Sequence, residues 1–163
     1  MRRVLLAAAA LAIAASAAAH AQGGPGGWVA APPYVTAWGP RNCTLAAIAS
    51  DGEGDQEVIA FESVGGVVNL TVARKSRPFQ PGVFGLPVLI DDQPFSTLES
   101  FATRESMRAP LIYDGPWHWM FKALRKGHRM TVNAGHDYTV SLDGFGDAYD
   151  QWIACVSRPG PTQ

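Results

Sequence analysis

The chain contains three pairs of segments rich in apolar residues. In each pair, a short polar or glycine-containing stretch separates the two segments. Apolar and polar positions alternate in these segments, or apolar residues run together, which is typical of half-buried or buried strands. Pro87 places the second pair near a sheet edge, because proline has no N–H to donate. With one further short segment before the first pair, the pattern predicts antiparallel strands at residues 42–49, 57–63, 67–74, 83–90, 95–101, 128–133 and 137–142.

In two other segments the apolar residues recur at intervals of three or four, which is the spacing of one face of a helix. The first predicted helix begins at Trp117, directly after Pro116, and ends at Gly127. The second covers about residues 144–156, with Asp143 as its N-cap. The predicted buried residues are Met120, Phe121 and Leu124 in the first helix and Leu142, Phe145, Tyr149, Trp152 and Val156 in the second.

These elements predict an α+β fold. Its antiparallel β-sheet, curved or sandwich-like, carries a helix near residue 120 and a C-terminal helix. A chain of 163 residues is long enough for one domain with one core. The predicted organisation is a signal peptide at residues 1–21, a Gly/Pro-rich leader at 22–41, a single globular domain at 42–158 and a flexible tail at 159–163. Parts of the leader are expected to be anchored to the domain by Trp28, Tyr34 and Trp38.

The first residues, MRRVLLAAAALAIAASAAAHAQ, predict a secretory signal peptide. Arg2 and Arg3 precede an apolar stretch, and the Ala-His-Ala before Gln22 has the pattern that signal peptidase cleaves. The alternative is a membrane anchor, for which the apolar stretch is short. The sequence therefore predicts a periplasmic or secreted protein with no membrane span after signal cleavage.

Charge and cysteine content narrow the class of protein further. Once Arg2 and Arg3 are set aside, acidic residues outnumber basic ones by about three, which argues against nucleic acid as a partner. The two cysteines are Cys43 and Cys155. Two cysteines in an oxidising compartment most often pair, so a disulfide is predicted between the first strand and the last helix. The alternatives are a free reactive thiol or a metal ligand.

Acidic and histidine residues give no clear metal motif. Four acidic residues match ligand positions of an EF-hand loop, namely Asp51, Glu53, Asp55 and Glu62. Gln56 stands where that loop needs glycine, and a strand rather than a helix is predicted next, so a solvated acidic turn is the better interpretation. No zinc spacing joins the histidines that remain after cleavage, which are His118, His128 and His136. The sequence predicts no metal and no cofactor, with a metal site assembled only in the folded protein as the alternative.

Motifs for catalysis are also missing from the sequence. Ser141 and Ser157 stand outside any GxSxG motif, and the GGPGG stretch follows no predicted strand. The pair Asp91-Asp92 falls at a hairpin corner. The sequence therefore predicts no catalytic residues and no enzyme. The alternative is a small periplasmic hydrolase whose site is assembled from distant residues.

Aromatic residues cluster around one predicted turn and form the candidate binding site, which consists of Tyr113, Trp117 and Trp119. Aromatic rings there can stack on a sugar or a peptide, although the same residues can also fill the core under the helix. The leading hypothesis is a periplasmic, non-catalytic accessory or binding module that acts through an aromatic and apolar surface. Its expected partner is an envelope protein or a small ligand.

Three stretches give the chain a family resemblance, namely LIDDQ at 89–93, ALRKGHRMTV at 123–132 and SLDGFGDAYDQWIAC at 141–155. Through them the C-terminal half resembles small exported proteins of alphaproteobacteria, including the invasion-associated locus B family. The extra cysteines that this family has around its central hairpin are missing here. The resemblance implies a β-rich, non-catalytic envelope protein and transfers no catalytic residues.

Overall fold

Strands make up more than half of the residues that the computed structural model describes, which are residues 27–35, 41–74, 77–111 and 118–158. The strands are β1 (Val29–Val35), β2 (Arg41–Ser50), β3 (Gln56–Val64), β4 (Val67–Ala73), β5 (Gly82–Ile90), β6 (Gln93–Ala102), β7 (Ser106–Leu111), β8 (Arg129–Asn133) and β9 (Asp137–Ser141). The helices are α2 (Trp119–Leu124) and α3 (Phe145–Val156).

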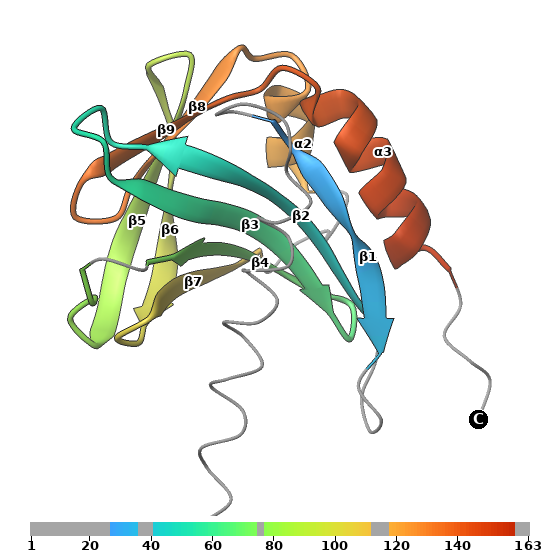
Figure 1. The fold of residues 1–163 in the computed structure, drawn as a ribbon, viewed down its shortest axis with the longest axis horizontal. Helices are drawn as coiled ribbons and strands as arrows, with labels where there is room; N and C mark the ends of the chain where they lie inside the picture. Colours follow the sequence, from blue (N-terminus) through green and yellow to red (C-terminus); the bar gives the residue numbers. More distant parts are fainter. Residues whose placement is uncertain (1–26, 36–40, 75–76, 112–117, 159–163) are drawn as a thin grey trace, which may run out of the picture.

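The strands form one antiparallel sheet that closes on itself as a barrel (Figure 1). The sheet order is β1-β2-β3-β4-β7-β6-β5-β8-β9, and a further pairing of β2 with β9 closes a ring of eight strands. Strand β1 lies outside this ring and pairs with β2 alone. Closure depends on a single residue pair, Ser50 with Thr139.

A second narrow seam lies where β6 meets β7. These strands pair only through Phe101 with Arg108 and Ala102 with Met107. Together with the β2–β9 seam, it divides the barrel into a five-stranded half (β1, β2, β3, β4 and β7) and a four-stranded half (β6, β5, β8 and β9). The barrel is therefore two curved sheets joined along two short seams.

The predicted α+β fold, with a curved or sandwich-like sheet, is wrong. The chain forms a closed barrel, and the two helices described are short. The prediction failed because alternation along a strand shows which face is buried but not which edges pair. Residues 106–111, for which no element was predicted, form the strand β7 that connects the two halves.

Two details of the strands also differ from the sequence prediction. Part of the predicted leader is β1, and Trp28 beside it is buried and donates a hydrogen bond to the carbonyl of Ser141 at 2.8 Å, as expected of an anchor. Strand β5 lies between β6 and β8 and not at an edge. Pro87 is tolerated because β8 pairs only with residues 88–90 of that strand.

Both predicted helices are present; α3 has the predicted bounds of about 144–156, whereas α2 is shorter than predicted. Helix α2 begins at Trp119 and not at Trp117, and the Nδ1 atom of His118 accepts a hydrogen bond from the Met120 backbone N–H at 3.2 Å. Helix α3 is preceded by Gly144, whose φ of 75° is in the left-handed region, so the predicted N-cap Asp143 is wrong. Residues 112–117, including Pro116 and Trp117, are outside the described ranges.

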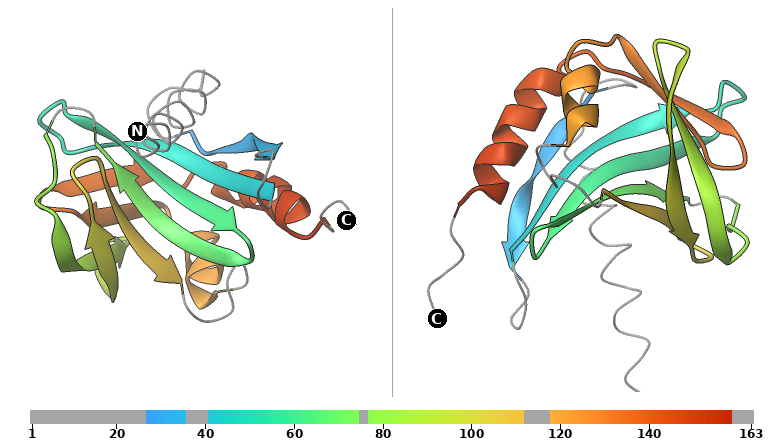
Figure 2. Two further views of the ribbon diagram at one scale, coloured as in Figure 1. Left: turned by 90° about the horizontal axis from the view of Figure 1, so that it is seen from below. Right: turned by 180° about the vertical axis from the view of Figure 1, so that it is seen from behind.

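The helices pack side by side against the interior of the barrel (Figure 2). The Phe61 ring, which points inward from β3, contacts Trp28, Phe121 and Phe145. Trp152 is 1% exposed and donates a hydrogen bond from its indole N–H to the Cys43 carbonyl at 3.0 Å. The helices and Trp28 thus fill one end of the barrel with aromatic side chains, and the predicted burial of Trp152 is confirmed.

The cysteines pair as predicted. The disulfide joins Cys43 on β2 to Cys155 on α3, with Cα atoms 6.1 Å apart. Within the described ranges, neither helix has the length and apolar character needed to cross a bilayer.

Candidate functional site

The predicted aromatic site is described only in part. Tyr113 and Trp117 lie outside the described residues, whereas Trp119 occupies the first position of α2. Its side chain is 53% exposed, although the next two residues, Met120 and Phe121, are fully buried. The buried neighbours fix the helix, so they also fix the position from which Trp119 projects.

Trp119 stacks on a second aromatic residue, Phe95, which the sequence prediction did not include. The ring centroids are 4.2 Å apart, with 30° between the ring planes. The register between β5 and β6 shifts at this point, because Val88 faces Ser96 and Leu89 faces Pro94. Phe95 is therefore the extra residue of a β-bulge, which turns its side chain toward α2. We call these two residues the Trp119–Phe95 pair.

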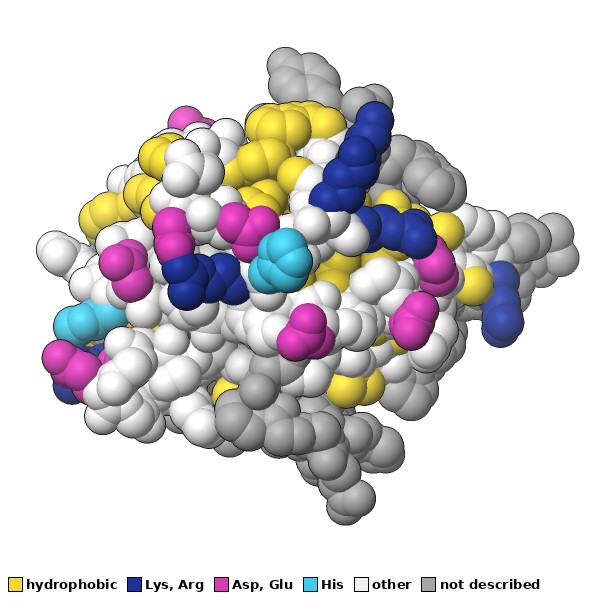
Figure 3. All heavy atoms as spheres, turned by 90° about the horizontal axis from the view of Figure 1, so that it is seen from above, with side chains coloured by type: hydrophobic (Ala, Val, Ile, Leu, Met, Phe, Trp, Pro, Cys, Tyr) yellow, Lys and Arg dark blue, Asp and Glu magenta, His cyan; other side chains and the backbone are white. Residues whose placement is uncertain are grey.

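A groove lies between α2 and α3. Its volume is about 520 Å³, and we call it the α2–α3 groove; it is lined by His118, Phe121, Lys122, Arg125, Lys126 and Tyr149. Residues spaced three or four apart share one side of a helix, which brings His118, Lys122 and Arg125 together. Seen from above (Figure 3), basic and hydrophobic side chains lie next to one another on the helix-bearing face.

Arg125 connects the two walls of the groove. Its guanidinium donates two hydrogen bonds to the Asp150 carboxylate, at 2.8 and 3.2 Å, and lies 5.5 Å from the centroid of the Tyr149 ring. Burial raises the pKa of Tyr149, and the positive charge of Arg125 opposes that rise. The Tyr149 hydroxyl is therefore neutral at physiological pH.

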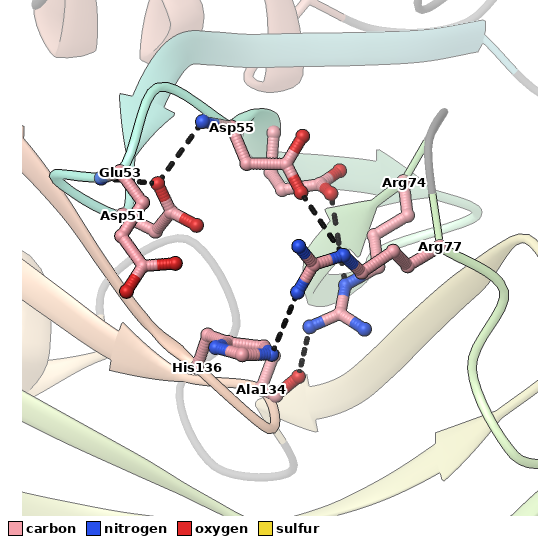
Figure 4. A network of polar contacts seen from close by, with 8 residues as sticks. Asp51, Glu53, Asp55, Arg74, Arg77, Ala134 and His136 are labelled. Atoms are coloured by element: carbon pink, nitrogen blue, oxygen red, sulfur yellow. Dashed lines mark hydrogen bonds and ion pairs between the residues drawn. The ribbon is translucent and has the colours of Figure 1, made fainter.

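A polar cluster fills the other end of the barrel (Figure 4). Glu57 and Arg74 follow the inward-facing positions of β3 and β4, and the Nε atom of Arg74 lies 3.6 Å from the Glu57 carboxylate. The Arg74 guanidinium also donates to the Ala134 carbonyl and lies 4.2 Å from the centroid of the Phe79 ring. Burial raises the pKa of the neighbouring Tyr138, and Arg74 opposes that rise.

Exposed polar residues surround this cluster at the barrel rim. Arg77 lies 3.8 Å from the Asp55 carboxylate and 3.3 Å from the Nε2 atom of His136. Asp51, Asp55 and Arg77 help to line a shallow pocket of about 360 Å³. The ion pair between Arg77 and Asp55 is partly exposed, which is typical of a solvated rim.

Acidic residues that match an EF-hand form hydrogen bonds within the protein. Burial opposes ionisation of Asp51, but the backbone N–H groups of Glu53 and Asp55 donate to its carboxylate and lower its pKa overall. Glu62 accepts a hydrogen bond from the Thr71 hydroxyl at 2.8 Å on β4. Over the described ranges, no group of three or more metal-binding side chains is arranged to hold an ion.

The remaining candidates from the sequence are spread over separate elements. The three histidines lie at the start of α2 (His118), beside Asp91 (His128) and beside Arg77 (His136). The Ser141 hydroxyl accepts from the Asp143 backbone N–H at 3.1 Å, and Ser157 ends α3. Asp91 and Asp92 form the β5–β6 turn, as predicted. Among these candidates, the Nδ1 atom of His128 lies 3.5 Å from the Asp91 carboxylate, and neither serine takes part in that pair.

The aromatic and basic residues around α2 include several that sequence reasoning did not assign to a site, namely Phe95, Lys122, Arg125, Lys126 and Tyr149. The spacing of the basic residues along the helix was a usable signal, whereas the contact with α3 was not readable from the sequence. In comparisons with known proteins, no family model, no curated protein and no solved structure matches this chain. A functional proposal therefore depends on the chain's own residues.

Proposed function

We propose that this protein is exported to the periplasm and acts there as a non-catalytic binding module. The observation that carries the proposal is the Trp119–Phe95 pair, in which a half-exposed indole lies 4.2 Å from a second ring. The predicted signal peptide at residues 1–21 supports export, and the Cys43–Cys155 disulfide suits an oxidising compartment.

A rigid exposed tryptophan is a favourable anchor for a partner. Trp119 loses little side-chain freedom on binding, because Phe95 and the buried residues after it already restrict its position. Aromatic anchors of this kind often contribute about 2 kcal/mol or more to a binding free energy. We therefore propose that an envelope protein or a small ligand contacts this pair.

The contacts of the titratable side chains favour a binding function over catalysis. The most buried carboxylate, Glu57, faces the guanidinium of Arg74. A carboxylate in an ion pair of this kind is already engaged, whereas a general acid or base needs a free position for a substrate. We accordingly expect purified protein to show no turnover of generic ester, peptide or glycoside substrates, and turnover of any of them would overturn this part of the proposal.

The test compares wild type with Trp119→Ala in pull-downs from envelope extract of the producing cell. A partner that contacts the Trp119–Phe95 pair is captured by wild type and lost with Trp119→Ala. Because Trp119 is 53% exposed, the melting temperature of the variant should stay close to that of wild type.

Phe101→Ala is the matched control, because Phe101 is an aromatic residue of almost equal exposure, 52%, at the far end of β6. Equal capture by wild type and Trp119→Ala would exclude the pair as the contact surface. Equal loss of capture with Phe101→Ala would mean that exposed aromatic surface in general, and not this pair, retains the partner.

A further inference from the structure

The α2–α3 groove concentrates positive charge in a chain whose mature part is predicted to be acidic. Lys122, Arg125 and Lys126 all line it. Arg125 is paired with Asp150, but no ion pair formed within the described ranges involves either lysine. The groove therefore presents two cationic side chains that no carboxylate of the described fold neutralises.

The base of the groove is aromatic. The rings of Phe121 and Tyr149 have centroids 5.1 Å apart, with 32° between their planes, and both side chains are largely buried. Arg125 is held in place by Asp150 on one side and by the Tyr149 ring on the other. The aromatic base is thus rigid, and the flexible lysine side chains lie around it.

We propose that the α2–α3 groove binds a small organic anion that carries an aromatic or apolar ring. The anionic group would pair with the ammonium groups of Lys122 and Lys126, and the ring would lie against Tyr149. The volume of about 520 Å³ is within the range of small-molecule sites. This inference does not rest on the Trp119–Phe95 pair, because neither residue of the pair lines the groove, although the Trp119 ring contacts His118, which does.

The experiment uses naphthalene-2-sulfonate as the probe and follows backbone amide signals of the disulfide-bonded protein by NMR. Binding should shift the signals of α2 and of the residues around Tyr149. The uncharged analogue 2-naphthalenemethanol should bind roughly fivefold more weakly, and Lys122→Gln with Lys126→Gln should cause a similar loss. Added salt at about 0.5 M should weaken sulfonate binding, because the cations are exposed.

The double variant Arg104→Gln with Arg108→Gln is the control, because it removes the same charge from exposed positions around β7. Melting curves should show that both double variants fold. Three results would each overturn the inference: shifts outside the groove, equal binding of the uncharged analogue, or equal weakening in the control. Binding to vesicles that contain phosphatidylglycerol, without a response to the free sulfonate, would indicate a membrane-surface contact and would also overturn it. Normal sulfonate binding by Trp119→Ala would separate this site from the proposed partner surface.

Discussion

At the level of single residues, Asp91 shows how one side chain joins two hairpins. Its φ of 50° places it in the left-handed region at the β5–β6 turn. Its Oδ1 atom accepts hydrogen bonds from the backbone N–H groups of His128, at 2.8 Å, and Arg129, at 3.0 Å. These N–H groups lie at the start of β8, so the turn of one hairpin fixes the beginning of the next.

We predict that Asp91→Asn lowers stability at neutral pH but not at low pH. The backbone donors at His128 and Arg129 hold the Asp91 pKa below its ordinary value of 3.8. A carboxylate with a lowered folded-state pKa stabilises the protein above the unfolded-state value, and that contribution disappears as the pH falls through the folded-state value. Urea unfolding of wild type and variant between about pH 7 and pH 2 measures the difference.

The difference should be constant above about pH 5 and should shrink toward zero below 3.8. Glu99→Gln is the control, because no described residue forms an ion pair or hydrogen bond with this exposed carboxylate. If the stability difference between wild type and Asp91→Asn were as large at the lowest pH as at pH 7, the charge of Asp91 would contribute nothing to stability.

Individual residues were predictable where their role follows from chain periodicity. Trp152, Met120 and Phe121 were correctly predicted as buried, because each lies on the apolar face of a helix. Phe95 was not predicted as part of a site, because its position depends on a register shift between two strands. Sequence alternation contains no signal for such a shift, since the strand on either side of it remains regular.

At the level of elements, the three hairpins and both helices were predictable. Each hairpin has its own apolar segments and turn residues close together in the sequence, so its pairing is local. Strands β1 and β7 were not predicted, since they lie in proline-containing or polar segments. Their strand structure is a consequence of tertiary pairing and not of local pattern.

Helix α3 is attached to the sheet at its C-terminal end by the Cys43–Cys155 disulfide. We predict that Cys43→Ser with Cys155→Ser destabilises the protein by roughly 4 to 5 kcal/mol, because the bond closes a loop between residues 112 positions apart. Urea unfolding with and without a reductant measures the effect. Reductant should destabilise wild type and leave the double serine variant unchanged.

Mass spectrometry of the non-reduced protein supplies the check on this prediction, and it should show one bond and no free thiol. Stoichiometric labelling of both cysteines under native, non-reducing conditions would contradict the pairing. Equal stability of wild type and the double serine variant would show that packing of Trp152 and its neighbours holds α3 without the bond.

At the level of the whole molecule, barrel closure was not predictable from the sequence. The seams between β2 and β9 and between β6 and β7 contain one and two residue pairs. Contacts this few leave no periodic trace in the sequence. The candidate site around α2 was predictable in part, because Trp119 stands out as an aromatic near a turn, whereas the α2–α3 groove exists only once both helices are packed.

The two ends of the barrel are closed by different chemistry. Aromatic side chains from β3 and both helices fill one end, whereas Glu57 and Arg74 lie at the other. Both charged side chains continue the inward-facing rows of their strands, and their side chains are 1% and 7% exposed. A buried ion pair stabilises little by itself, but removal of one partner leaves the other charge buried and uncompensated.

The last prediction follows from this asymmetry. Replacing only Arg74 by Met should destabilise the protein by about 3 to 5 kcal/mol, because the buried Glu57 carboxylate then loses its ion pair with this guanidinium. Glu57→Leu combined with Arg74→Met should be more stable than Arg74→Met alone, since neither member of this buried ion pair then remains. Urea unfolding of the single and double variants forms a double-mutant cycle that measures the coupling.

Arg108→Met is the control, because it breaks the exposed pair with Glu62 and should cost less than about 1 kcal/mol. Equal costs for Arg74→Met and Arg108→Met would mean that water reaches Glu57, and that the polar end of the barrel is open to solvent.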